Sequence, residues 1–277
     1  MNDTQEERPS AIAAAWMLAK REWVRFFRQR NRVVSAILQP LLFWLLFGTG
    51  LRGSFQGAGD QGFLEYFLPG TVALITLFTA IFATISVIED RREGFMQAVL
   101  VAPVGRFPVL LGKVLGGAAI AWVQAMLFLV LASLVGTLPL GWEIFPLALL
   151  LAIVALAMCS LGMIVAWPMD STQGFHAIMM LGLMPMWLLS GAFFPIPAPG
   201  VEATVGQLIL HWVMRLNPLS YSIAQMRQLM YPEIDFAATT WAPAPIFSWV
   251  VSVGFLIVTF AIAARLMRGS RSADLVV

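Results

Sequence analysis

The 277-residue chain is 60% hydrophobic, and only 12% of its residues are charged, with 17 Lys and Arg against 15 Asp and Glu. Soluble domains carry about a quarter of their residues as charged side chains. This deficit excludes water as the solvent for most of the surface, and no nucleic-acid partner is expected.

Uninterrupted apolar runs of about 20 residues recur along the chain, which is the length of helix that crosses a bilayer. Lipid offers no partners to backbone groups, and continuous runs favour helices over the alternating strands of a barrel. We therefore predict an all-α integral membrane protein, a single transmembrane domain over 1–277. Its six spans are predicted at 33–51, 71–88, 114–136, 144–167, 177–196 and 246–264.

Fourteen of the 17 Lys and Arg residues lie before the first span, between the second and third, or after the sixth. The positive-inside rule therefore predicts that both termini are cytoplasmic, in a multi-pass protein of the inner (plasma) membrane. The acidic first ten residues do not resemble a cleavable signal peptide, so the first span is expected to direct insertion.

The helix predicted at 11–31 is amphipathic: aromatic side chains share one face, and arginines gather on the other. This pattern is typical of a helix that lies in the membrane interface. Two roles stay open, a topogenic anchor or an elbow helix that also touches a cytoplasmic partner. The residues are Ile12, Trp16, Ala19, Trp23, Phe26 and Phe27 on the apolar side and Arg21, Arg25, Arg28 and Arg32 on the other.

The cytoplasmic loop 89–113 combines charge with a small apolar face. It begins with Glu89-Asp90-Arg91-Arg92-Glu93-Gly94, and acidic residues suit the start of a helix. An apolar face on such a loop requires a cover, which is either the protein's own helices or a groove of a partner. The residues at helical spacing are Met96, Val99, Leu100 and Pro103.

The third span begins next to Gly112-x-x-x-Gly116, a spacing that permits close helix packing. None of the six runs contains Asp, Glu, Lys or Arg. Ion-coupled carriers need ionisable groups inside the membrane, so this absence argues against a self-powered transporter.

The fifth span runs into Leu189-Ser190-Gly191-Ala192-Phe193-Phe194-Pro195-Ile196-Pro197. Its two prolines predict that the helix breaks near the outer surface, where a re-entrant element is tolerated if protein buries it. The outer loop 197–245 then holds two amphipathic stretches, at 206–216 and 219–231, with the turn-forming pair Asn217-Pro218 between them.

Motifs that carry chemistry are missing from the sequence. No H-E-x-x-H or G-x-S-x-G pattern occurs, His176 and His211 are isolated, and Cys159 is expected to be a packing residue. Gly112-Lys113 is followed by Val114, not by the Ser or Thr of a phosphate loop. We therefore expect no catalytic site, metal or cofactor, and any ATP must bind another chain.

The motifs on the inner and outer sides together resemble the membrane subunit of an ATP-binding-cassette exporter of the ABC-2 type. The resemblance extends from Ala11 to the sixth span and is most specific at 89–94, 101–106, 189–196 and 217–221. It implies a connecting helix at 11–31, outer re-entrant helices after the fifth span, and a coupling helix that inserts in the ATPase. The residues that match the coupling helix include Asp90, Arg91, Arg92, Glu93, Gly94, Met96, Pro103 and Arg106.

The resemblance further implies two permease subunits, identical or related, above two ATPase subunits. We hypothesise that Phe193 and Phe194, next to Pro195, close the outer end of the pathway, and that Arg92 and Glu93 couple it to the ATPase. Two alternatives remain: an ion-coupled secondary carrier, and a membrane assembly or scaffold factor without transport.

Overall fold

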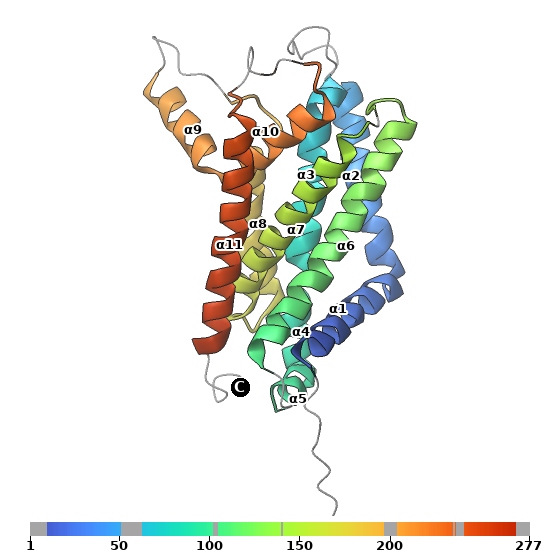
Figure 1. Ribbon diagram of the computed structural model, residues 1–277, viewed down its shortest axis with the longest axis vertical. Coiled ribbons are helices and arrows are strands. Elements are labelled where there is room, and N and C mark those ends of the chain that lie inside the picture. Colours follow the sequence, from blue (N-terminus) through green and yellow to red (C-terminus); the bar gives the residue numbers. More distant parts are fainter. Residues whose placement is uncertain are drawn as a thin grey trace, which may run out of the picture.

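The computed structural model describes residues 10–50, 63–101, 105–139, 141–196, 204–234, 236 and 241–269. Within these ranges all regular structure is helical, and eleven α-helices form an elongated bundle (Figure 1). Helices α1 (Ala11–Arg28), α4 (Ile85–Arg92) and α5 (Phe95–Val101) lie at one end of the bundle. Helices α9 (Val205–Leu216) and α10 (Pro218–Met230) lie at the other. We call the first end inner and the second outer, after the orientation that the sequence predicts.

The centre of the bundle consists of α3 (Phe63–Ala83), α6 (Arg106–Leu134) and α7 (Ile144–Ala166), each of which packs against the other two. Glycines bring these helices close: a Cβ on Gly117 would lie 2.7 Å from the Cys159 sulfur, which is fully buried. Lipid tails are as apolar as a protein core, so such close packing holds membrane helices together where hydrophobic burial does not.

Four stretches of the described chain are long and apolar enough to cross a membrane: 63–92, α6, α7 and α11 (Pro245–Gly269). Helix α2 (Arg30–Gly50) and helix α8 (Thr172–Leu188) occupy the positions of the first and fifth predicted spans. The 17 residues of α8 give a length of about 25 Å, slightly less than the roughly 30 Å of a hydrocarbon core.

The largest departures of the helices from the predicted spans, eight residues each, occur at three places. Helix α3 begins at Phe63, eight residues before the predicted span. The helix is interrupted at Thr84, whose hydroxyl donates to the Ile81 carbonyl at 2.6 Å. Helix α6 begins at Arg106 instead of 114, since the charge of Lys113 is paired inside the protein. Helix α8 ends at Leu188, because the chain turns at Gly191, which has φ +76°.

The two amphipathic stretches of the outer loop form α9 and α10, within one residue of the predicted bounds. Asn217 separates them: its side-chain oxygen accepts a hydrogen bond from the Leu219 amide at 3.0 Å, and Pro218 begins α10. Proline suits this position because the first amides of a helix have no partner inside it. Helix α10 packs against α3, α7 and α11, so it belongs to the bundle.

Candidate functional site

Helix α1 lies across the inner part of α6, and two glycines of α6 allow its backbone to touch. A Cβ on Gly112 would lie 2.6 Å from the Ala15 carbonyl oxygen, and one on Gly116 would lie 2.9 Å from Cβ of Glu22. The close packing predicted from Gly112-x-x-x-Gly116 is therefore present, and its partner is α1. This contact fixes where the charged side chains of α1 can reach.

Helix α1 presents parts of both predicted faces to the rest of the protein. Of the predicted apolar stripe, Phe26 is buried against the protein, whereas Trp16 and Phe27 are 70% and 51% exposed. Trp23 is half-buried and contacts Phe27, with 5.6 Å between ring centroids. The side chains of Arg21 and Arg25 lie against α4, where they form ion pairs with carboxylates of that helix.

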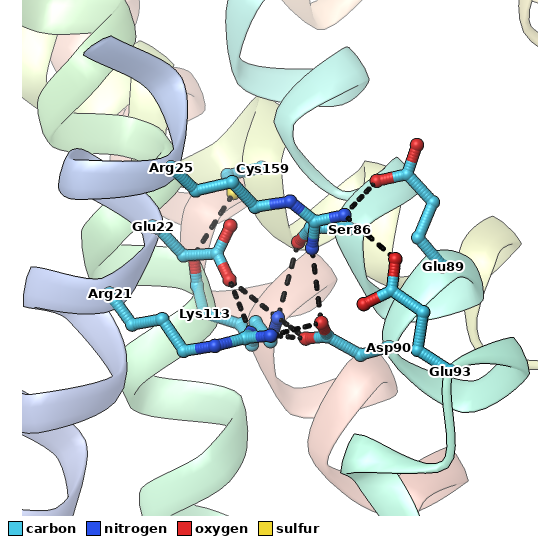
Figure 2. A network of polar contacts seen from close by, with 9 residues as sticks. All are labelled: Arg21, Glu22, Arg25, Ser86, Glu89, Asp90, Glu93, Lys113 and Cys159. Atoms are coloured by element: carbon cyan, nitrogen blue, oxygen red, sulfur yellow. Dashed lines mark hydrogen bonds and ion pairs between the residues drawn. The ribbon is translucent and has the colours of Figure 1, made fainter. Parts of the chain in front are cut away.

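Asp90, in the last turn of α4, is the centre of the inner charge cluster (Figure 2). Its carboxylate is fully buried and accepts two parallel hydrogen bonds from Arg21, at 2.7 and 2.8 Å. Arg25 donates to the same carboxylate at 3.0 Å and to Glu89 at 2.5 Å. We define the inner charge cluster as Arg21, Glu22, Arg25, Ser86, Glu89, Asp90, Glu93 and Lys113.

Lys113 is the member of the cluster that belongs to α6. Its ammonium group donates to Asp90, to Glu22 at 2.5 Å and to the Ser86 hydroxyl at 3.2 Å (Figure 2). Only 2% of the Lys113 side chain is exposed. A buried ammonium is tolerated when its charge is compensated and its three protons are donated, and both conditions hold here.

The cluster joins three helices through ionic hydrogen bonds. A paired fork of arginine on carboxylate fixes orientation as well as distance. The hydrogen bonds to Asp90 raise the pKa of the Arg21 guanidinium, which also lies over the Phe95 ring, 3.7 Å from its centroid. Helices α1, α4 and α6 are therefore held in one register at the inner end.

The two arginines that follow Asp90 contact a different element, the turn between α7 and α8. Arg91 donates to the carbonyls of Trp167 at 2.6 Å and Met169 at 3.2 Å. Arg92 donates to the carbonyl of Asp170 at 3.0 Å. Helix α4 is thus attached to the α7–α8 turn on one side and to α1 and α6 on the other.

The remaining residues predicted for coupling have different surroundings. Met96 is 1% exposed and packs into the core, so the protein's own helices cover this part of the predicted apolar face. Arg106 donates to the Met267 carbonyl at 2.8 Å, near the end of α11. Gly94 adopts φ +75° between α4 and α5, and Glu93 beside it is 62% exposed. Pro103 lies outside the described residues. Their coupling role remains a prediction.

Sequence reasoning missed Glu22, Ser86 and Lys113. Lys113 was assigned to the loop end, although it lies two turns inside α6. Two signals were available: a lone acidic residue on an arginine-rich helix, and a lone lysine beside a glycine pair. Neither residue identifies its partner without the packing of α1 on α6.

At the outer end, the chain after α8 folds back as a compact turn. Phe193 packs edge-on against Phe67, with 5.4 Å between ring centroids, and also contacts Phe63 and Trp187. Phe194, in contrast, is 57% exposed, and Pro195 is exposed beside it. The structure therefore gives the three residues different surroundings, and the hypothesis of an outer closure remains a prediction.

A helical bundle with several membrane-length helices and a charged inner end defines a multi-pass membrane protein. The chain belongs to the ABC-2 type transporter family, whose model matches residues 13–231. The sequence-based resemblance is thus confirmed, and the protein is a transport permease. Members of this family are membrane subunits that generally work with an ABC ATPase.

Several curated proteins are similar to this chain over most of their length. A putative transport permease of Cyanophora paradoxa is 23% identical over 79% of this chain and 74% of its own. Nodulation protein J of Rhizobium leguminosarum bv. trifolii is 27% identical over 73% of this chain and 76% of its own. A daunorubicin resistance ABC transporter permease protein of Streptomyces coeruleorubidus is 21% identical over 96% and 89%.

Proposed function

We propose that the protein is the membrane subunit of an ATP-driven exporter and forms the path of the substrate. Two copies, or one copy and a related subunit, would stand above two ATPase subunits. ATP would close the ATPase pair, and the resulting motion at the inner end would shift the spans between inward-open and outward-open states. Such a shift requires that ATP binding favours one state over the other.

The inner charge cluster is the observation that carries this proposal. A force applied to α4 and α5 would reach α1 and α6 through Asp90 and Lys113, because charged hydrogen bonds resist a change of geometry. The same force would reach α7 and α8 through Arg91 and Arg92. The inner loop is therefore connected to most of the bundle.

The proposal includes a topology of six spans with both termini in the cytoplasm. The distribution of Lys and Arg supports this orientation, since the inner cluster and the C-terminal end of α11 lie at the same end of the bundle (Figure 1). Helices α2 and α8 would be the first and fifth spans, and α1 would lie at the inner interface with Trp16 facing lipid.

The test is coexpression with an ABC ATPase, sought first among the neighbouring genes, followed by purification of the complex. A cysteine at Gln97, which is exposed on α5, is expected to crosslink to the ATPase. A cysteine at Val135, 64% exposed at the opposite end, serves as the matched control and is expected to remain free. Absence of co-purification, or equal crosslinking of both, contradicts the proposal. Transport by the permease alone on an ion gradient would establish the carrier instead.

A further inference from the structure

Arg227, in α10, is a buried cation of a different kind from those of the inner charge cluster. Its exposed fraction is 3%, and none of the described carboxylates forms an ion pair with it. Its Nε atom has no hydrogen-bond partner among the described residues. Burial of a charge without an opposite charge is costly, so the arginine requires an explanation other than fold stability.

The contacts of Arg227 converge on one carbonyl. Its Nη2 atom donates to the carbonyl oxygen of Gly191, and its guanidinium lies over the Tyr66 ring, 4.2 Å from the centroid. The Tyr66 hydroxyl donates to the same oxygen at 3.2 Å. Two donors from two helices, α3 and α10, therefore hold a single peptide group of the outer turn.

Gly191 lies three residues after the end of α8, where the outer turn changes direction. It adopts φ +76°, and a Cβ there would lie 3.0 Å from the Ile196 side chain, so no other residue fits without strain. Gly191 is followed by Ala192, which is fully buried, and by Phe193 in its aromatic pocket. The position of Gly191 thus sets the position of the residues after it.

A second attachment holds the start of the same turn. The Trp187 indole donates to the Gly70 carbonyl at 2.8 Å, and a Cβ on Gly70 would lie 2.7 Å from the Ala192 carbonyl oxygen. The turn is therefore pressed against α3 by backbone contact. Ser190, between the two attachments, is only 1% exposed.

We propose that Arg227 is a positioning residue that clamps the outer turn, residues 189–196, onto α3 in the closed state of the permease. A planar guanidinium reaches the carbonyl and stacks on Tyr66 at the same time, which neither lysine nor an apolar side chain does. Release of Gly191 frees Phe193 to leave its pocket and opens the outer end. The inference rests on the proposed function, since only a transport path needs an outer closure.

The test measures the accessibility of the turn in purified protein, with no ATPase present. Ser190→Cys, in a Cys159→Ala background, reports opening through its rate of reaction with a fluorescent maleimide. Arg227→Met is expected to raise this rate at least tenfold, and Arg227→Lys by less. Tyr66→Phe, which keeps the ring and removes one donor, is also expected to give a smaller rise. Arg265→Met, the same change at an exposed position of α11, is expected to leave the rate unchanged.

Native Cys159 distinguishes a local opening from general loosening, because it is fully buried in the bundle centre. In variants that retain Ser190, Arg227→Met is expected to leave Cys159 protected. An unchanged rate at Ser190→Cys, or an equal rise at Cys159, overturns the clamp. Neither result affects the proposed function, which stands or falls on co-purification with the ATPase.

Discussion

The strongest test of the inner charge cluster is the substitution Asp90→Asn, which keeps the shape of the side chain and removes its charge. Three cations then lose their shared anion, and the amide presents an NH₂ group to at least one donor. Asp170→Asn is the matched control, because the Asp170 side chain is 89% exposed and pairs with Arg91 at 3.3 Å.

The expected loss of stability depends on whether each cation keeps another carboxylate partner or regains contact with water. Removing one partner of a buried ion pair costs about 3–5 kcal/mol. Lys113 keeps Glu22 at 2.5 Å, and the side chains of Arg21 and Arg25 are 31% and 20% exposed and can recover water. We therefore expect the lower limit, about 3 kcal/mol.

For a chain of this size, about 3 kcal/mol corresponds to a decrease of Tm of about 6–12 °C, at about 2–4 °C per kcal/mol. The measurement is thermal unfolding of the purified protein in detergent, followed by tryptophan fluorescence. Asp170→Asn is expected to lower Tm by less than about 2 °C, since exposed pairs contribute about 0–1 kcal/mol. If Asp90→Asn lowers Tm no more than Asp170→Asn, the cluster does not hold the three helices.

Three further predictions concern the packing of α1, the inner loop and the outer turn. Gly112→Ala is expected to lower stability by about 1–3 kcal/mol in thermal unfolding, because its Cβ would meet the backbone of α1. Glu93→Lys, at an exposed position, is expected to keep insertion and stability but to uncouple ATP hydrolysis from export. Phe193→Ala with Phe194→Ala is expected to leave assembly with the ATPase intact and to change the export rate, because the aromatic contacts of the outer turn are lost.

Each of these predictions has a result that would contradict it, and the glycine substitution also has a matched control. Gly182→Ala, in α8, meets no atom within 4 Å and is expected to be neutral or to stabilise by up to about 1 kcal/mol. If Gly112→Ala behaves in the same way, α1 does not need the close approach. Normal coupling in Glu93→Lys would remove this residue from the ATPase contact. Unchanged export by the double alanine variant would show that the two rings do not close the path.

Local sequence predicted the helices well where one physical rule dominates. Helix α7 follows the predicted span 144–167 to within one residue, because an uncharged run bounded by polar turns has no alternative in lipid. Helices α9 and α10 were also predicted, since Asn217-Pro218 terminates one helix and starts the next. The predictions were less accurate where charge was assumed to end a helix, as at the start of α6.

The face that α1 presents illustrates why the rest was not predictable. Its periodicity separates aromatic from basic residues but identifies no partner for the arginines. Arg21 pairs with Asp90, 69 positions further along the chain, and the approach of α1 to Gly112 makes this pair possible. A local sequence pattern gives no information about a contact between residues so far apart in the chain.

The sequence by itself therefore determined the solvent of this protein, the number of apolar runs and the predicted orientation, because these depend on composition, on run length and on where basic residues fall. Only the tertiary structure decided that Asp90 and Lys113 are buried together and that Arg227 holds Gly191. A charge is tolerated inside a protein only beside a partner or a polar group that compensates it. Which partner it finds depends on the packing of helices that lie far apart in the chain.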